Sequence, residues 1–285
     1  QRKRPFVAAL VALVALVALA ALAYVNDALG ANVRMRYPEG VAVSSTAVAG
    51  YPAGSVFFVE YTNHAMRVAD GTTGGTSFVV GAGPALQGWK DLTGTSAKFY
   101  MPQALALHNG DADIYICESN AVIRKVELAS LAVTTVAGDI TNKAGETATP
   151  GMGVGPALAG AQFNGPNGIC FLGNIGFIAD HNNHMIKKWD LASATVSLLA
   201  GDSGGASGQV DTESGSATFH APKKLSIDSR GVLYVASRKG VRMVDSETGV
   251  TRTLVATPAG ASNYLAVDVN AAGTQLWASC WNIGQ

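Results

Sequence analysis

The sequence predicts an all-β protein: a β-propeller of five to six blades preceded by a single N-terminal transmembrane helix. Two observations predict the propeller. Short apolar runs are separated by Gly-rich turns, with 33 Gly and 48% hydrophobic residues, and this pattern recurs about every 40 residues. A third observation, an uninterrupted apolar segment, predicts the helix. We therefore expect residues 1–30 to form a basic N-terminus and membrane helix, and residues 31–285 to form the propeller.

The apolar segment at residues 6–25 is long enough to cross a bilayer. Its 20 consecutive uncharged residues would span about 30 Å as a helix. Its leucines recur at every third residue and leave no polar face, which excludes a helix lying in the membrane plane. The residues expected to span the membrane include Phe6, Leu10, Leu13, Leu16, Leu19, Leu22 and Val25. A cleaved signal peptide is the alternative, because Ala21-Leu22-Ala23 could serve as a cleavage site.

Charges and sequence motifs indicate on which side of a membrane, and in which kind of membrane, the protein would lie. Arg2, Lys3 and Arg4 precede the apolar segment and should stay on the cytoplasm-like side, which places the propeller on the trans side of a single-pass protein. The chain has no Asn-x-Ser/Thr acceptor, and it starts with Gln1 rather than Met, as a processed precursor or a truncated sequence would. Together these features favour an organellar membrane over the cell surface.

Five copies of one pattern follow the apolar segment, and each complete copy is expected to form four short strands. The copies cover residues 38–80, 97–138, 161–201, 217–256 and a last stretch that starts at residue 262. Three Gly-rich inserts separate successive copies, at residues 81–96, 139–160 and 202–216. We interpret the inserts as flexible loops on one face of the ring, where proteins of this kind usually make contacts.

The clearest copy reads A-x-F-x-x-P-x-G-I and then hydrophobic-x-A-D-x-x-N-H-x-I-x-K. Its matching residues are Ala161, Phe163, Pro166, Gly168, Ile169, Ala179, Asp180, Asn183, His184, Ile186 and Lys188. With this pattern the chain resembles the NHL-repeat family of β-propellers, a resemblance that implies the fold but no single function. The other copies match in part. Residues that keep or replace the second half of the motif are Glu60, Asn63, His64, Glu118, Arg124, Ser237 and Ser279.

The ring of blades could be completed in two ways. The last copy ends where its third strand would begin, near Ile283. The protein is then either a five-bladed propeller with a defective closing blade or part of a longer chain with a sixth blade. Asn32 to Tyr37 alternates in the manner of a strand and could join the last blade.

Two sets of polar residues are candidate metal ligands or catalytic groups. His181 and His184 form an H-x-x-H pair within a turn, although that spacing would not place both on one strand face. Glu60, Glu118 and Asp180 recur directly after the second strand and could line a channel as an acidic ring. A structural role explains both sets more simply, with the acids capping backbone N–H groups of the next turn. We expect no catalytic residue, no metal and no cofactor.

The net charge argues against one class of function, and the positions of the cysteines indicate the state of their thiols. Outside Arg2, Lys3 and Arg4 the chain holds 17 basic and 20 acidic residues, a net charge of −3 that disfavours nucleic-acid binding. Three cysteines, Cys117, Cys170 and Cys280, fall in expected strands and are interpreted as buried free thiols.

The function that these features favour is a non-catalytic protein-interaction scaffold anchored in a membrane, where it would act as an accessory subunit of a protein complex. Its partners would be other subunits of that complex and the lipid bilayer around residues 6–25. The alternative is a metal-dependent hydrolase or lyase that uses the central channel. Metal content distinguishes the two functions, because only the enzyme needs a bound ion.

Overall fold

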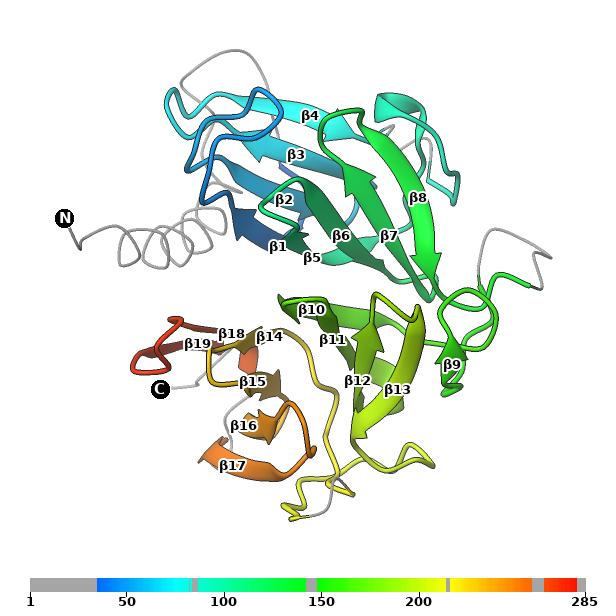
Figure 1. Ribbon diagram of the computed structural model, residues 1–285, viewed down its shortest axis with the longest axis vertical. Coiled ribbons are helices and arrows are strands. Elements are labelled where there is room, and N and C mark those ends of the chain that lie inside the picture. The colour runs from blue at the N-terminus through cyan, green and yellow to red at the C-terminus, as the bar shows by residue number, and fades with distance from the viewer. Residues whose placement is uncertain are drawn as a thin grey trace. The chain divides into compact units, whose positions relative to one another are not determined.

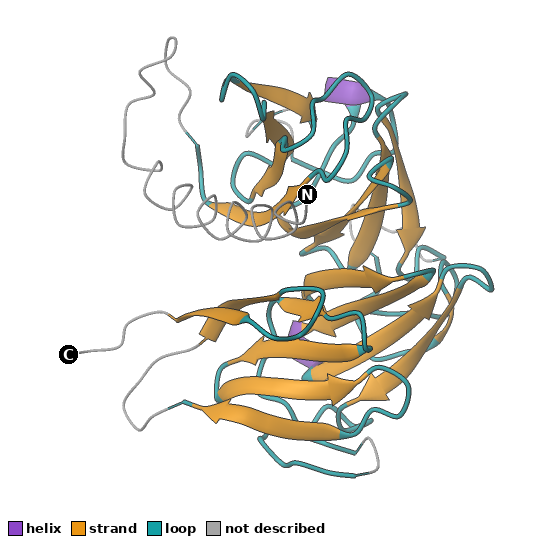
Figure 2. Cartoon of the chain, turned by 60° about the vertical axis from the view of Figure 1, so that its left-hand side comes forward, coloured by secondary structure: helices purple, strands orange, loops and turns teal. Residues whose placement is uncertain are grey.

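The computed structural model describes residues 35–81, 83, 87–141, 148–213, 216–257 and 264–280. Strands dominate this part of the chain, with short 3-10 turns at η2 (Gly94–Ser96) and η3 (His181–Asn183) (Figure 2). The candidate membrane span at residues 6–25 lies outside the described residues. Among the residues that are described, no helix is long and apolar enough to cross a membrane.

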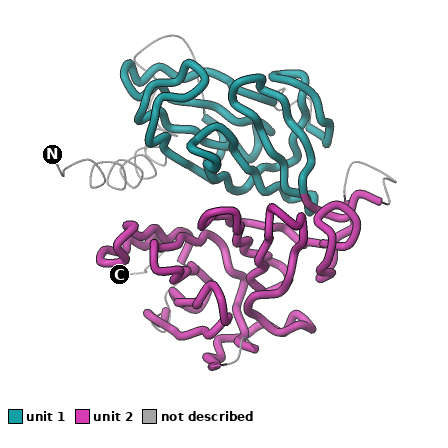
Figure 3. The backbone as a smooth tube through the Cα atoms, viewed as in Figure 1, with its two compact units in different colours: residues 1–136, 144–147 teal, residues 137–143, 148–285 magenta. Residues whose placement is uncertain are grey.

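The chain divides into two units, and each is described by itself (Figure 3). Unit 1 comprises residues 1–136 and 144–147, and unit 2 comprises residues 137–143 and 148–285. Each unit contains two four-stranded antiparallel meanders, which we call blades 1 to 4 in chain order (Figure 1).

Blade 1 and blade 2 make up the described core of unit 1. The strands of blade 1 are β1 (Pro38–Val43), β2 (Val56–Glu60), β3 (Ala65–Ala69) and β4 (Thr76–Val80). The strands of blade 2 are β5 (Pro102–His108), β6 (Asp113–Glu118), β7 (Val122–Glu127) and β8 (Ala132–Ala137). In both blades each strand pairs with the next one along the chain.

Blade 3, blade 4 and a further strand pair make up unit 2. The strands of blade 3 are β10 (Pro166–Leu172), β11 (Ile175–Asp180), β12 (Met185–Asp190) and β13 (Thr195–Ala200), with β9 (Gly155–Pro156) added beside β13. The strands of blade 4 are β14 (Leu225–Ile227), β15 (Val232–Ser237), β16 (Gly240–Asp245) and β17 (Thr251–Ala256). The further pair is β18 (Tyr264–Val269) with β19 (Leu276–Cys280).

The fold is therefore all-β, with four propeller blades and a two-stranded fifth sheet. The expected blade order and the four strands of each complete copy are confirmed. Residues 281–285, where the third strand of the last blade was expected to begin, lie outside the described residues. Of the expected closing strand, residues 32–34 also lie outside, and Met35 to Tyr37 precede β1 without forming a strand.

Within each unit, the two blades pack against each other through apolar side chains from both sheets. In unit 1, Phe57 and Val79 of blade 1 share a buried cluster with Ile114 of blade 2 and with Phe99, which precedes that blade. In unit 2, Phe177 of blade 3 shares a cluster with blade 4 residues and with Phe219. Phe99 and Phe219 share with Phe163 one repeated position before the first strand of a blade, and each of the two packs its blade against the preceding one.

Glycine in the Pro-x-Gly motif is required by the close approach of the following blade. A Cβ at Gly40 would lie 2.7 Å from the Cα of Ala104, which occupies the same repeat position in blade 2. A Cβ at Gly168 would lie 2.2 Å from the carbonyl oxygen of Lys223 in blade 4. Such distances leave no room for a side chain, so these residues allow the first strands of neighbouring blades to come together.

A part of each insert is held against a blade, which corrects the interpretation of these parts as flexible loops. Within the described residues, one short stretch of each insert pairs with the fourth strand of the blade that follows it. Thr93 bridges to Ala132, β9 pairs with β13, and Thr212 bridges to Thr251. A fourth strand is otherwise an open edge, and the inserts cover part of that edge in blades 2, 3 and 4.

Candidate functional site

The three recurring carboxylates end the second strand of blades 1, 2 and 3. Glu60, Glu118 and Asp180 are the last residues of β2, β6 and β11, and all three are fully buried. A buried carboxylate is stable only when hydrogen bonds or a counter-charge replace its water. The groups around each carboxylate therefore decide whether it is available for chemistry.

Each carboxylate accepts a hydrogen bond from the backbone that enters its own blade. The Arg36 N–H donates to Glu60 at 3.0 Å, the Tyr100 N–H to Glu118 at 2.7 Å, and the Asn164 N–H to Asp180 at 2.7 Å. These donors precede the first strand of the blade, whereas the expected donors were in the turn that follows. The carboxylate thus ties the first strand's entry to the end of the second strand.

The asparagine of the motif donates to the second carboxylate oxygen. Asn63 Nδ2 donates to Glu60 at 2.8 Å, and Asn183 Nδ2 donates to Asp180 at 2.8 Å. Asn183 also donates to the carbonyl of Gly151, 2.7 Å away, in the insert before blade 3. The asparagine is therefore a structural part of the turn, as the sequence pattern predicts.

A buried cation on the third strand completes each cluster. Arg67 lies 3.7 Å from Glu60, Arg124 lies 2.8 Å from Glu118, and Lys187 lies 3.0 Å from Asp180. Both members of every pair are at most 2% exposed. The carboxylates thus have partners from their own blades, which leaves little capacity to hold a metal or to accept a proton from a substrate.

The repeated phenylalanine lies beneath this cation. The charged groups of Arg124, Lys187 and Arg242 lie 5.1, 5.0 and 4.9 Å from the ring centres of Phe99, Phe163 and Phe219. In blade 1, Arg67 lies 4.8 Å from the ring of Phe78 on β4 instead. A cation over an aromatic face is favourable, and more so in a desolvated site.

Burial is the largest influence on the pKa values of Glu118, Asp180 and Lys187. It raises the pKa of Glu118 to about 7, although the Arg124 charge and the Tyr100 N–H both lower it. Burial likewise raises the pKa of Asp180 against the opposing effect of Lys187, and it lowers the pKa of Lys187. The shifts result from desolvation within a closed cluster, and they do not require a role in catalysis.

Blade 4 builds the same cluster without the recurring acid. Ser237 occupies the acid's position, and its hydroxyl donates to the carbonyl of Gly240 at 2.9 Å. The cation, Arg242, instead lies 2.7 Å from Asp211 in the preceding insert. Asp211 also accepts from the backbone and the hydroxyl of Thr253 on β17, both at 2.9 Å.

Blade 2 contains both the recurring acid at the end of its second strand and an aspartate in the insert that precedes it. Arg124 lies 2.7 Å from Asp91, which accepts from the backbone and the hydroxyl of Thr135, each at 3.0 Å. Asp91 and Asp211 are the polar residues that sequence reasoning missed. Their spacing in the sequence could have identified them, because each aspartate precedes the repeated Phe of its blade by eight residues.

The motif histidines join one blade to the next. His64 and His184 both have left-handed backbone conformations, with φ of 52° and 58°. His64 Nδ1 accepts the Met101 N–H at 3.0 Å, and His184 Nδ1 accepts the Ala221 N–H at 3.1 Å. Each therefore accepts a hydrogen bond at Nδ1 from the loop that begins the next blade.

The H-x-x-H pair does not form a metal site with the neighbouring residues. His181 Nδ1 donates to the carbonyl of Pro222 at 3.0 Å, and burial, more than any other effect, lowers the pKa of His181 to about 4. Among the described residues no cluster of three or more His, Cys, Asp and Glu side chains could hold a metal ion.

The three cysteines are free and lie in strands. Cys117 is buried, whereas Cys170 and Cys280 are only partly buried, which corrects the expectation for those two. Although the residue as a whole is partly exposed, burial of the thiol group raises the pKa of Cys170 well above its usual range, and the charge of Asp268 adds to this. A thiol with a raised pKa is a weaker nucleophile than an ordinary one at neutral pH.

Comparisons with known proteins agree with a propeller. No protein-family model matches the chain. A 41-residue stretch is 44% identical to NHL repeat-containing protein 2 of Bos taurus, covering 14% of this chain and 6% of that protein. The match therefore supports an NHL-like repeat in one short stretch and spans only a small part of the curated relative.

Two solved structures are similar over most of the chain. One is a chain in the crystal structure of a nidogen/laminin complex, with a TM-score of 0.57 and 12% identity, covering 88% of this chain and 74% of that chain. The other is an auxiliary nutrient binding protein from Bacteroides ovatus, with a TM-score of 0.53 and 18% identity, covering 75% of this chain and 47% of that chain. At such low identity the likeness shows the fold alone.

Proposed function

We propose that this chain is a membrane-tethered, NHL-like β-propeller that binds other proteins without catalysing a reaction, as an accessory subunit of a membrane complex. The proposal rests on one observation: the carboxylate of each repeated polar cluster is already held by groups of its own blade. Glu60, Glu118 and Asp180, the residues most suited to chemistry, are each buried against a cation and donors of their own blade. Because the buried acids stabilise the blades, the residues that bind partners are expected at the surface of the fold.

The names of the structural neighbours are compatible with this proposal. One of those chains comes from a nidogen/laminin complex and the other is an auxiliary nutrient binding protein, so similar folds occur in proteins that bind partners or ligands. Both are too distant in sequence for a ligand to be transferred to this chain. They support binding as the general class of function and nothing narrower.

Membrane attachment rests on the sequence of residues 6–25. Twenty uncharged, mostly apolar residues after Arg2, Lys3 and Arg4 would place the propeller on the trans side of a membrane, with an organellar membrane favoured. The propeller would then meet the exposed parts of neighbouring subunits close to the bilayer.

The test combines membrane extraction with co-purification. The chain is expressed in cells of its source, membranes are washed with alkaline carbonate, and the chain is recovered in mild detergent with its partners. We expect it to stay in the washed membranes and to bring down a reproducible set of proteins. A Leu13→Arg/Leu16→Arg variant should be released, because each Arg at a helix centre costs about 3 kcal/mol of insertion free energy.

The matched control places the same two charges elsewhere. Leu158 and Val210 are exposed positions of unit 2, so Leu158→Arg/Val210→Arg should leave the chain in the membrane. Release of the unmodified chain by carbonate would refute the anchor. A retained chain that co-purifies with no protein would refute the scaffold function.

A further inference from the structure

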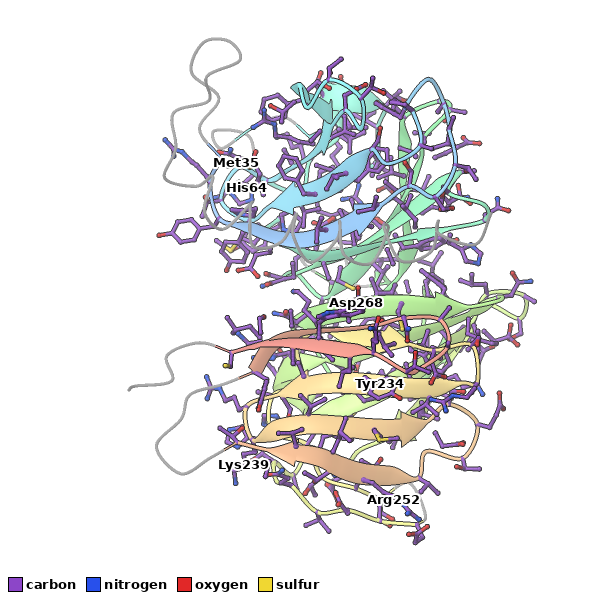
Figure 4. The ribbon with its side chains drawn as sticks, turned by 90° about the vertical axis from the view of Figure 1, so that its left-hand side faces the viewer. Met35, His64, Tyr234, Lys239, Arg252 and Asp268 are labelled. Atoms are coloured by element: carbon purple, nitrogen blue, oxygen red, sulfur yellow. The ribbon has the colours of Figure 1, made fainter. Side chains whose placement is uncertain are left out.

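Two segments of blade 4 bring four cations together at one end of the blade. Backbone hydrogen bonds join the segment 220–224 to the end of β15 and to the turn 238–239 that follows it. The Arg238 N–H donates to the His220 carbonyl at 2.9 Å, and the Lys223 N–H donates to the Ala236 carbonyl at 2.8 Å. We call the surface of Lys223, Lys224, Arg238 and Lys239 the basic patch. Figure 4 shows Lys239 at one end of blade 4 and Arg252 at the other.

The four side chains of the patch all reach the surface of blade 4. Arg238 and Lys239 are exposed, and Lys223 and Lys224 are partly exposed. Within the described part of the chain, no acidic side chain forms an ion pair with Arg238 or Lys239. The Lys224 ammonium donates to the carbonyl and the side-chain oxygen of Asn167, at 2.8 and 2.7 Å.

The neighbouring histidines do not offset or add to this charge at neutral pH. Burial, the largest effect, lowers the pKa of His181 to about 4, and Lys223, Arg238 and Lys224 lower it further. Burial and then the charges of Lys239 and Arg238 lower the pKa of His220. The positive charge of the patch therefore comes from its Lys and Arg side chains and not from the histidines.

Blade 2 shows that the fold does not require these cations. The corresponding residues there are Gln103 and Ala104 on the first strand, and Ser119 and Asn120 in the turn. Blade 2 makes the same contact with its preceding blade that blade 4 makes, through a histidine that accepts a backbone N–H. Because the same scaffold forms without charge in blade 2, the charges of blade 4 are a property of its surface.

We propose that the basic patch is the docking site for an acidic segment of a partner protein. The inference rests on the proposed scaffold function and places its contact on blade 4. Carboxylates complement a cluster of Lys and Arg, and such complementary surfaces steer and orient partners. Nucleic acid fits less well, because the chain outside Arg2, Lys3 and Arg4 has a net charge of −3 and the patch contains no Phe, Tyr or Trp on which bases could stack.

The test measures binding of a short fluorescein-labelled oligoglutamate peptide to the full chain in mild detergent, by fluorescence anisotropy at low ionic strength. The substitutions come from blade 2: Arg238→Ser/Lys239→Asn in one variant and Lys223→Gln/Lys224→Ala in another. We expect each variant to bind the peptide about tenfold more weakly, since two exposed ion pairs are lost. Added salt should weaken binding to the unmodified chain.

A charge-matched control separates the patch from net charge. Lys90→Gln/Arg252→Gln removes two exposed cations outside the patch and should bind like the unmodified chain. Equal weakening in this control, or no binding of oligoglutamate over oligoglutamine, would overturn the proposal. Tighter binding of an oligouridylate at the same site would also overturn it and assign the patch to nucleic acid. If either patch variant does not fold, the other decides.

The peptide test and the membrane co-purification distinguish failure of the patch assignment from failure of the proposed function. If the patch variants lose oligoglutamate and also lose partners in the membrane co-purification, both proposals stand. If the peptide does not bind but the partners remain, only the patch assignment fails. If no partner is ever recovered, the scaffold function fails whatever the peptide does.

Discussion

At the scale of single residues, the buried cation of each blade has the clearest energetic consequence. Arg124 is fully buried, bonds to Glu118 and Asp91, and donates to the carbonyls of Lys98 and Lys90. It also lies on the ring of Phe99. Removing it would leave the Glu118 carboxylate buried without its counter-charge.

We predict that Arg124→Met destabilises unit 1 by about 3 to 5 kcal/mol, the usual cost of breaking a buried ion pair. The free energy of unfolding in urea measures this. Arg252→Met is the control, because Arg252 and its partner Glu213 are 68% and 77% exposed and should contribute at most about 1 kcal/mol. A loss no larger for Arg124→Met than for the control would show that the buried pair is not structural.

Glu118 also makes stability depend on pH. Its folded pKa of about 7 lies above the unfolded value of 4.5, so the folded state holds the proton more tightly. The stabilisation from this group is fully present below about pH 4.5 and is lost as the pH rises through about 7. We predict that the midpoint of thermal unfolding falls more steeply over this pH range in the unmodified chain than in Glu118→Gln, in which Asp180, whose folded pKa is also raised, still contributes. Parallel profiles between pH 4.5 and 7 would contradict it.

At the scale of the blade, the repeat motif is a set of contacts between consecutive segments. The acid joins the entry of the first strand to the end of the second, and the histidine joins that turn to the next blade. The insert then adds an edge to the blade that follows. Each part of the motif thus stabilises a contact between a different pair of segments. This explains why one part can be lost without loss of the blade, as in blade 4, where Ser237 replaces the acid.

The Pro-x-Gly position gives the sharpest test of blade packing. We predict that Gly40→Ala destabilises unit 1 by about 1 to 3 kcal/mol, because its Cβ would meet the backbone of Ala104 and Leu105 at 2.7 and 2.8 Å. Gly75→Ala is the control within the same blade, since its Cβ meets nothing closer than 3.4 Å. Urea denaturation of the two variants compares them. Equal stability would mean that the approach of the two first strands is not a tight packing contact.

At the scale of the whole molecule, the period and the motif of the clearest copy were enough to predict the blades. Asp180, Asn183 and His184 stand at offsets that recur in blade 1, and the structure gives them equivalent contacts there. The inserts were harder to interpret. Asp91 and Asp211 lie in Gly-rich stretches without strand periodicity, and their partners, Arg124 and Arg242, are more than 30 residues away in the sequence. Long-range ion pairs of this kind leave only a weak spacing signal.

The central claim is that the recurring acids belong to the blades and not to a metal or reaction site. Its most direct test is the metal content of the purified full chain, measured by mass spectrometry after dialysis without chelator. We predict zinc and calcium well below one ion per chain, and no change in metal content on Glu60→Gln, Glu118→Gln or Asp180→Asn. A stoichiometric, tightly bound ion that these substitutions or replacement of His181 and His184 remove would contradict it and favour the metal-dependent enzyme.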